Sequence, residues 1–297
     1  MVTVNGRLQV VATPIGNLAD LSARARSALE AADVIAAEDT RHTGALLRAV
    51  GIATPLVSLH EHNEAQRTPA LLARLAAGET VALVSDAGMP LLSDPGFVLV
   101  QQAVRAGCTV SCIPGPSAIT AALAVAGLPT DRFCFEGFLP ARAPQRRAAL
   151  AALAHEPRTL VFFEAPHRIV ATLRDLAEQL GGERPAVVAR ELTKAHETIY
   201  RGALQELAAR AGADENFARG ELTLVVHGAA APATAGVDEQ LLRRAVALLA
   251  RDLPPGRVAA IAAQLTGASR AAAYALATGA NAGSGHHQPP PDEEEMP

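Results

Sequence analysis

The sequence predicts an α/β protein with two sheet-containing domains, followed by a small helical domain. A chain of 297 residues exceeds what one hydrophobic core usually serves. Short apolar runs alternate with amphipathic segments from residue 7 to residue 228, a pattern typical of βαβ units. Beyond residue 228 the sequence changes to small residues and then to helical patterns, so a third unit is expected.

The N-terminal domain, residues 7–118, is expected to contain a mostly parallel sheet. Two amphipathic segments, 64–78 and 95–107, each end in a glycine that suits the C-terminus of a helix. Helices that alternate with strands return the chain across the sheet, so successive strands run parallel. The predicted strands of this domain are residues 8–13, 34–38, 55–60, 80–86 and 109–114.

The second domain, residues 119–228, is expected to contain a mixed sheet. Two of its strands are separated by only a few residues around Lys194, and so short a connection requires an antiparallel hairpin. The predicted strands of this domain are residues 132–140, 158–165, 185–193, 197–202 and 221–228.

Residues 237–279 form the predicted helical domain, which the linker AAAPATAG at 229–236 joins to the second sheet. Three short helices are expected, and the LTGAS turn gives the last two a helix-turn-helix pattern. Five arginines against three acidic residues give a charge of +2, which agrees with a packing appendage or with a nucleic-acid contact. Residues 280–297 are low in complexity and are expected to form a disordered acidic tail.

Composition disfavours several classes of protein. No apolar run is long enough to span a bilayer, and no basic segment precedes an apolar one at the N-terminus, so neither a membrane partner nor a signal peptide is expected. Three cysteines at no zinc-binding spacing indicate a reduced, cytoplasmic setting. The net charge of −4 equals that of the four acidic residues in the tail, so the other 279 residues sum to zero and local basic patches decide any RNA contact.

Three loops at the carboxyl ends of predicted strands form the candidate ligand site, because ligands of open parallel sheets bind there. These loops are TPIGNLAD at 13–20, SDAGMPLLSDPG at 85–96 and IPGPSAITAA at 113–122. The first loop lacks the G-x-G-x-x-G pattern of dinucleotide sites. Ala87 and Gly88 allow a ligand to approach the backbone, and Ser117 opens a helix whose free amides favour an electron-rich ligand atom.

In order and spacing, PIGN, DAGMP and PGPSA resemble the motifs of the tetrapyrrole methylase family, whose members bind S-adenosylmethionine between two α/β domains. Five further stretches resemble the branch of that family that methylates ribosomal RNA. They are AEDTRHTGALL at 37–47, SLHEHNE at 58–64, EGFLP at 136–140, FFEAPHR at 162–168 and RELTKAHET at 190–198. The resemblance covers residues 7–228 nearly continuously, and the helical segment that follows resembles the C-terminal extension of that branch.

The resemblance implies a 2′-O-methyltransferase that acts on the ribose of one cytidine in the decoding region of 16S rRNA, within the small ribosomal subunit. It also implies a homodimer with S-adenosylmethionine as cofactor. By matching motif positions, the expected cofactor contacts are Ile15, Asp86, Ala87, Gly88, Met89, Leu92, Ser117 and Ala118. Other members of the family read G-D-P where this chain has Gly88-Met89-Pro90, so backbone contacts are expected there.

The candidate catalytic residues are Lys194, Glu191, Glu38 and Asp39. Methyl transfer needs in-line approach of the ribose hydroxyl and a group that helps to remove its proton. Lys194 is the only lysine among 26 basic residues. That scarcity fits a coding bias towards arginine, so its position could be chance. As a functional group, Lys194 would be either a base with a lowered pKa or a charged anchor, and the neighbouring Glu191 and Glu197 favour the charged form.

The candidate RNA contacts are basic side chains near the predicted cleft. They are Arg41, His60, His62, Arg142, Arg146, Arg147 and Arg168. Arginine forks match phosphate geometry, although a solvated helix start would also explain the basic stretch 140–147. The H-x-H pattern at His60 and His62 has no further ligand at metal-binding spacing, so no metal is expected.

Two other functions fit parts of the sequence. One is a tetrapyrrole or diphthine-type methylase on the same scaffold, which the basic stretch and the helical domain disfavour. The other is a non-catalytic ribosome- or DNA-binding protein that uses the helix-turn-helix pattern. The three strand-end loops disfavour that second alternative, because loops of this composition are typical of ligand sites.

Overall fold

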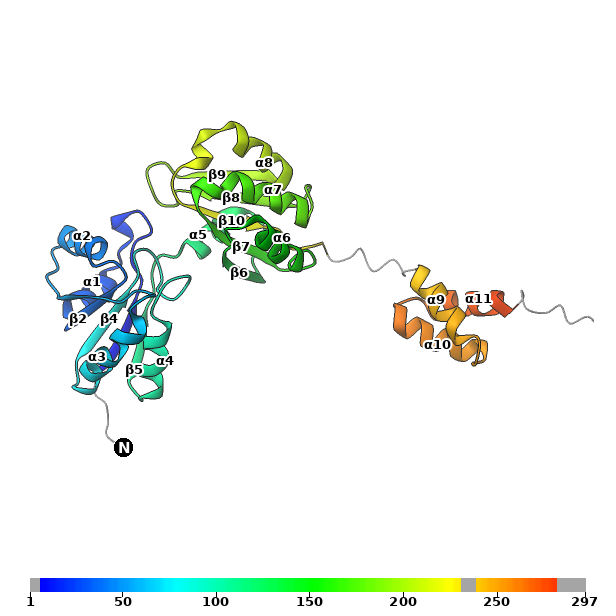
Figure 1. The fold of residues 1–297 in the computed structure, drawn as a ribbon, viewed down its shortest axis with the longest axis horizontal. Coiled ribbons are helices and arrows are strands. Elements are labelled where there is room, and N and C mark those ends of the chain that lie inside the picture. Colours follow the sequence, from blue (N-terminus) through cyan, green and yellow to red (C-terminus); the bar gives the residue numbers. More distant parts are fainter. Residues whose placement is uncertain (1–5, 231–238, 282–297) are drawn as a thin grey trace, which may run out of the picture. The chain divides into compact units, whose positions relative to one another are not determined.

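The computed structural model describes residues 6–230 and 239–281 (Figure 1). The chain as far as Ala229 forms one compact unit, and the helices beyond Ala230 form a second. The first unit contains two five-stranded sheets. None of the helices within the described ranges is both long and apolar enough to cross a membrane.

The first sheet has the strand order β3-β2-β4-β1-β5, and all of its paired strands run parallel. The prediction of a mostly parallel sheet is therefore confirmed. Its strands are β1 (Arg7–Val11), β2 (Val34–Ala37), β3 (Leu56–Ser58), β4 (Thr80–Val84) and β5 (Thr109–Ile113). Its helices are α1 (Ala23–Ala31), α2 (Thr40–Val50), α3 (Glu64–Ala76) and α4 (Phe97–Arg105), with the short 3-10 helix η1 (Leu18–Asp20).

Two apolar cores cover the faces of this sheet. Leu71 and Leu75 of α3 pack with Leu99 of α4 on one face, whereas Leu29 of α1 and Leu47 of α2 pack on the other. Side chains of a strand point alternately to the two faces, so β1 contributes Val10 to one core and Val11 to the other. This arrangement buries both faces, as a parallel sheet requires.

A buried glutamate connects α3 to α4. Glu64 is 8% exposed, and its Oε1 accepts hydrogen bonds from the backbone N–H groups of Gly96 at 3.1 Å, Val98 at 2.8 Å and Leu99 at 3.2 Å. The first N–H groups of a helix have no partner within the helix, so a carboxylate at this position is stabilising. The contact fixes the end of the 85–96 loop against α3.

The second sheet has the order β6-β7-β10-β8-β9, in which β6 and β7 are parallel and the other pairs antiparallel. The predicted mixed sheet is confirmed, and so is the hairpin of β8 and β9. Its strands are β6 (Phe133–Phe138), β7 (Thr159–Glu164), β8 (Pro185–Arg190), β9 (Thr198–Ala203) and β10 (Leu222–Val226). The helices are α5 (Ala118–Ala126), α6 (Ala143–Ala152), η2 (Pro166–Arg168), α7 (Ile169–Leu180), α8 (Leu204–Ala213) and η3 (Glu215–Ala218).

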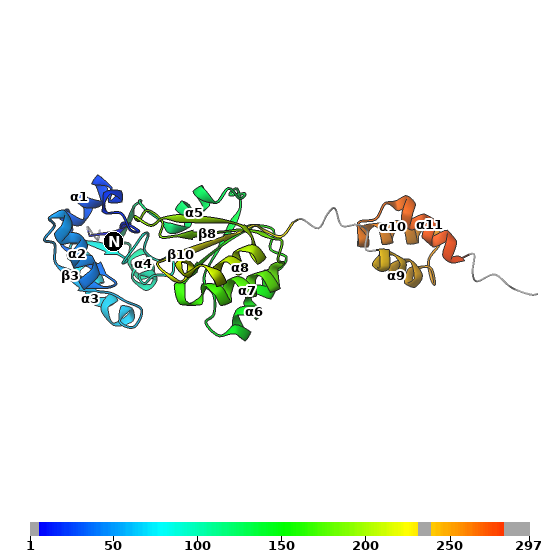
Figure 2. The ribbon, with the colours of Figure 1, turned by 90° about the horizontal axis from the view of Figure 1, so that it is seen from above.

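The helices divide between the two faces of this second sheet. Ile119 and Leu123 of α5 pack on Val187 of β8, whereas α6, α7 and α8 pack on the opposite face with Val188 (Figure 2). Helix α5 comes directly after β5, so it carries the chain from the first sheet to the second. Its apolar side chains pack in the core of the second sheet.

The second unit consists of α9 (Glu239–Leu249), α10 (Pro255–Thr266) and α11 (Arg270–Asn281). The predicted C-terminal helices are therefore present, with a core of their own built around Leu242, Val258 and Ala273. Gly267 adopts a left-handed conformation, with φ of 71°, at the turn between α10 and α11. Most of the predicted linker and most of the predicted tail fall on 231–238 and 282–297, which lie outside the described residues.

Candidate active site

The order of the first sheet brings the three candidate loops together. Strand β1 lies between β4 and β5, and all three strands run parallel, so their carboxyl ends meet at one edge. Two backbone hydrogen bonds join the first loop to the second, from Thr13 N to Gly88 O at 2.9 Å and from Gly88 N to Thr13 O at 3.1 Å. The loops therefore form one continuous wall.

This wall borders a cavity of about 340 Å³ between the two halves of the first unit. Seven of the eight predicted cofactor contacts line it, namely Ile15, Ala87, Gly88, Met89, Leu92, Ser117 and Ala118. The eighth, Asp86, is absent from the lining, and its Oδ1 accepts a hydrogen bond from Asp39 N at 3.1 Å. The structure thus brings most of the predicted set to one site.

The second half supplies cavity residues that were not predicted. They include Phe138, Phe163, Glu164, Ala189, Leu192, Glu221 and Thr223. Phe138 and Phe163 stand at the ends of β6 and β7, within EGFLP and FFEAPHR. Their place at strand ends is the signal that could have identified them, since the carboxyl ends of β6 and β7 lie side by side.

Two features prepare the wall for a ligand. Gly88 adopts φ of 79°, a left-handed conformation that residues with a Cβ rarely adopt, and a Cβ built there would lie 3.2 Å from Ile15 Cγ2. Ser117 is the N-cap residue of α5, yet its side chain makes no capping hydrogen bond. Its hydroxyl group therefore remains available at the cavity.

Carboxylates gather beside the cavity. Asp94 lines it, and burial raises the Asp94 pKa to about 6. The hydroxyl of Ser85 opposes this rise, and the charges of Glu38 and Asp86 add smaller increases. Burial and the charge of Asp86 likewise raise the pKa of Glu38. Such a cluster favours a cationic ligand, because a positive charge relieves the repulsion among carboxylates. Asp94 is a site residue that the sequence did not single out.

Asp39 lies at the start of α2 and serves that helix. Its Oδ1 accepts a hydrogen bond from Arg41 N at 2.8 Å, and its Oδ2 lies 2.6 Å from Arg41 Nη2. The Arg41 side-chain hydrogen bond holds the pKa of Asp39 well below its usual range. Asp39 and Glu38 are both absent from the cavity lining, and Glu38 accepts a hydrogen bond from Asp86 N at 3.5 Å.

Lys194 lies in the β8–β9 hairpin, held between two carboxylates. Its Nζ is 2.8 Å from Glu191 Oε1 and 3.3 Å from Glu221 Oε1. Burial alone would lower the pKa of Lys194, but the hydrogen bond that Lys194 donates to Glu191 and the charges of Glu221 and Glu191 outweigh it, so the pKa is raised. Lys194 is therefore protonated at neutral pH.

The hairpin also contacts the first half of the unit. A Cβ built on Gly16 would lie 2.3 Å from Lys194 Cγ, so the lysine stem crosses the PIGN loop where only glycine leaves room. Glu191 and Thr193 adopt left-handed conformations, with φ of 53° and 66°, which few residues other than glycine adopt. The hairpin thus bridges both halves at the rim of the cavity, next to its lining residue Leu192.

Comparison with known proteins agrees with this geometry. The model of the family "Tetrapyrrole (Corrin/Porphyrin) Methylases" matches residues 7–208. The chain belongs to the tetrapyrrole methylase family. A relative named ribosomal RNA small subunit methyltransferase I, from Xylella fastidiosa, is 54% identical and covers 91% of this chain and 98% of its own. The protein of that name from Escherichia coli O157:H7 is 50% identical over 92% of this chain and 94% of its own.

Solved structures share the fold of this methylase. Uroporphyrin-III C-methyltransferase from Thermus thermophilus, complexed with S-adenyl homocysteine, has a TM-score of 0.52 at 21% identity, over 75% of this chain and 97% of its own. At that identity the likeness shows the fold alone.

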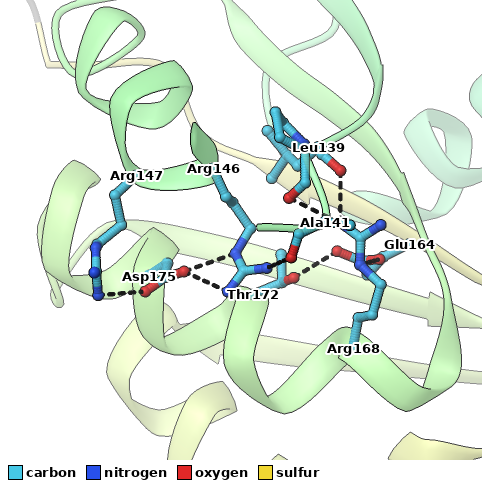
Figure 3. A network of polar contacts seen from close by, with 9 residues as sticks. Leu139, Ala141, Arg146, Arg147, Glu164, Arg168, Thr172 and Asp175 are labelled. Carbon is cyan, nitrogen blue, oxygen red and sulfur yellow. Dashed lines mark hydrogen bonds and ion pairs between the residues drawn. The ribbon is translucent and has the colours of Figure 1, made fainter. Parts of the chain in front are cut away.

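The predicted RNA-contact arginines of this methylase fall into two environments, and Figure 3 shows Arg146, Arg147 and Arg168. Arg146 is 4% exposed, and its Nη2 lies 2.6 Å from Asp175 Oδ2. The Arg168 Nε lies 3.1 Å from Glu164 Oε1, and its Nη2 donates to Leu139 O at 2.6 Å. Both arginines are therefore engaged in ion pairs and hydrogen bonds within the protein.

The other basic candidates of the methylase are more accessible. Arg142, the N-cap residue of α6, and Arg147 within that helix are exposed, although Arg147 Nη1 lies 3.8 Å from Asp175 Oδ1. Arg41 has 90% of its side chain exposed. His60 and His62 stack edge to face at 6.0 Å. Within 6–230 and 239–281, no three His, Cys, Asp or Glu side chains gather as a metal site would require.

Proposed function

We propose that the chain methylates the 2′-oxygen of one cytidine ribose in the decoding region of 16S rRNA, within the small ribosomal subunit in the cytoplasm. The enzyme is a ribosomal RNA methyltransferase that uses S-adenosylmethionine, as its family and its relatives of 50% and 54% identity indicate. The observation that carries the proposal is the cavity where the three cofactor loops face the Lys194 hairpin. The same relatives argue against the alternative of a non-catalytic ribosome- or DNA-binding protein.

The cavity fits the proposed cofactor. Its volume of about 340 Å³ lies within the range of roughly 300–1,000 Å³ that small-molecule sites occupy. Ile15, Met89 and Phe163 supply apolar walls, while Gly88 offers its backbone without a side chain in the way. The carboxylate of Asp94 suits a cationic sulfur.

The residues around the cavity have complementary roles in this proposal. S-adenosylmethionine supplies an electrophilic methyl group on a cationic sulfur. Asp94, once ionised, stabilises that charge and can accept the proton of the ribose hydroxyl. Lys194 is the cationic anchor for a ribose or phosphate oxygen, because its ion pairs oppose loss of its own proton. Of the other predicted catalytic residues, Glu191 orients Lys194, Glu38 raises the pKa of Asp94, and Asp39 caps α2.

The proposed RNA surface is revised by the burial of two arginines. Arg142, Arg147 and Arg41 are assigned to phosphate contact, whereas Arg146 and Arg168 hold the loop before α6 in place. The proposal includes a homodimer. Two exposed apolar side chains on α4, Phe97 at 61% and Val104 at 60%, support an interface there.

Methyl transfer to small subunits tests the proposed function directly. Small subunits that lack the modification are incubated with the enzyme and S-adenosylmethionine labelled with tritium in the methyl group. Label should appear on the 2′-oxygen of one cytidine after nuclease digestion. Label on a base, or none at all, would contradict the proposal, and a parallel reaction with free 16S rRNA shows whether the particle is needed.

Lys194→Arg should keep most of the methyl-transfer activity, within about fivefold, whereas Lys194→Met should lower it by about 10- to 100-fold. An arginine preserves the positive charge between Glu191 and Glu221, and methionine leaves both carboxylates without their cation. Initial rates on small subunits provide the measurement, with cofactor affinity from calorimetry as the control. If the Lys194→Arg enzyme were as inactive as Lys194→Met, the result would instead favour Lys194 as the base that removes the ribose proton.

Activity should fall as the pH decreases through about 6, the pKa of Asp94. Below that pH kcat/KM should decrease by about tenfold per pH unit, because the protonated carboxyl neither stabilises the sulfonium nor accepts a proton. Asp94→Asn should flatten this part of the profile and lower activity at pH 7.5 by about tenfold or more.

Stability supplies the control for this pH profile. A carboxyl whose pKa is raised by folding binds its proton more tightly in the native state, so this group stabilises the fold as the pH falls from about 6 towards its ordinary value of 3.8. As the pH is lowered, an activity loss caused by protonation of Asp94 should therefore appear before the melting temperature decreases. A wild-type profile retained by Asp94→Asn would remove Asp94 from the reaction.

A further inference from the structure

A second pocket lies at the end of the second sheet, with a volume of about 470 Å³. It is lined by Arg190, His196, Glu197, Thr198, Tyr200 and residues Asn216 and Arg219. Successive residues of a strand point to opposite faces, and on β8 Ala189 lines the cofactor cavity whereas Arg190 lines this pocket. The two hollows are thus on opposite faces of the same strand end.

Arg190 gives this pocket a fixed positive charge. The residue is only 8% exposed. Its Nε donates to Arg219 O at 3.0 Å and its Nη1 donates to His196 O at 3.0 Å. Two neutral carbonyls hold the guanidinium in place, but neither neutralises it.

No carboxylate in the described part of the chain forms an ion pair with Arg190. The two nearest in sequence have other direct partners: Glu191 pairs with Lys194 at 2.8 Å, although the charge of Arg190 also helps to lower the Glu191 pKa, and Glu197, which lines the pocket, accepts the Thr193 N–H at 2.6 Å. A buried charge without a direct ion-pair partner is costly, so natural proteins usually keep such a group paired or give it a ligand. Arg190 is therefore a candidate group for binding an anion.

The other arginine of the pocket is free to turn towards that anion. Arg219 meets Glu215 at 3.4 Å, but their side chains are 67% and 89% exposed, and ion pairs of this kind contribute little. Asn216 adds an amide at the same wall, although its Nδ2 donates to Asp214 at 2.9 Å. Two guanidinium groups that converge on one pocket match the geometry of a phosphate.

We propose that this pocket binds one phosphodiester of the RNA backbone, close to the nucleotide that is methylated. The hairpin supports this position: Leu192 lines the cofactor cavity, and four residues later His196 lines the pocket. A phosphate bound at Arg190 would hold the RNA backbone beside the β8–β9 hairpin, which also borders the cofactor cavity. The RNA assignment rests on the proposed function, whereas the anion site itself does not.

The arginine side chains provide a direct readout. In the full chain labelled with ¹⁵N, the Arg190 Nε–H signal is assigned by its loss in Arg190→Lys and is then followed during titration with inorganic phosphate and with the dinucleotide CpC. Both ligands should shift it. Arg219→Ala should weaken both affinities by about fivefold or more, and Arg105→Ala, which removes an exposed arginine outside the pocket, should leave them unchanged.

The outcomes separate the possible sources of the anion. A shift with inorganic phosphate alone would overturn the RNA assignment, and no shift with either ligand would overturn the site. On small subunits, Arg219→Ala should also reduce the slope of log affinity against log salt by about one, as loss of one phosphate contact does. Absence of ribose methylation with intact CpC binding would count against the proposed function and leave this site standing.

Discussion

Gly88→Val should weaken the affinity for S-adenosylmethionine by about 100-fold or more, which calorimetry measures directly. A residue with a Cβ at φ of 79° is strained by roughly 1–3 kcal/mol, and a branched side chain adds to that strain. The new Cβ would also press on Ile15 Cγ2 at 3.2 Å, so a second cavity residue must move. Both effects distort the wall that Gly88 and Thr13 hold together.

Gly107→Val provides the matched control. Gly107 has nearly the same backbone conformation, with φ of 74°, but nothing lies within 4 Å of the position of its Cβ. It follows Ala106, the C-cap residue of α4, and is absent from the cavity lining. This variant should lose stability through strain and keep its cofactor affinity. Equal affinities for the two variants would contradict the placement of Gly88 in the cofactor site.

Asp175→Ala should lower the free energy of unfolding by about 3–5 kcal/mol, the usual result of removing one partner of a buried ion pair. The Arg146 side chain is 5% exposed and that of Asp175 is 9% exposed, so the remaining guanidinium would be left without a counter-charge inside the protein. Arg146→Ala should have a similar effect from the other side. Urea denaturation followed by circular dichroism measures both.

Arg147→Ala separates stability from RNA binding. Arg147 lies 3.8 Å from the same carboxylate but has 45% of its side chain exposed, so its removal should cost less than about 1 kcal/mol. Its affinity for small subunits should fall, with a smaller salt dependence. An Arg146→Ala protein that folds as stably as Arg147→Ala would show that Arg146 is not a structural residue.

The difference between these neighbouring arginines was within reach of the sequence. Arg146 stands four residues before Leu150, which puts both on one face of α6, and both are buried. Arg147, the next residue, lies on a different face of α6 and is exposed to solvent. The basic composition of the stretch predicts phosphate contact for all of its arginines, whereas the helical period distinguishes the buried one from the exposed one.

The strands and loops of the first half were predictable because their signals are local. Apolar runs mark β1, β4 and β5, and Gly88 and Ser117 follow such runs directly. The charged state of Lys194 was predictable in part, because Glu191 stands three residues before it and pairs with it at 2.8 Å. The second carboxylate, Glu221, is distant in sequence and reaches Lys194 only because β10 pairs with β8. Asp94 is similar, since its raised pKa reflects burial first and then the charges of Glu38, which follows β2, and of Asp86 in its own loop.

The single lysine also makes the chain a substrate for site-selective chemistry. Amine reagents have one side-chain target, Lys194, in addition to the α-amino group, and 25% of that side chain is exposed. Acylation requires the neutral amine, so the ion pairs with Glu191 and Glu221 should make the reaction slow. The extent of labelling, read as one mass increment on one peptide, therefore reports whether the hairpin still lies across Gly16 or has moved away from it.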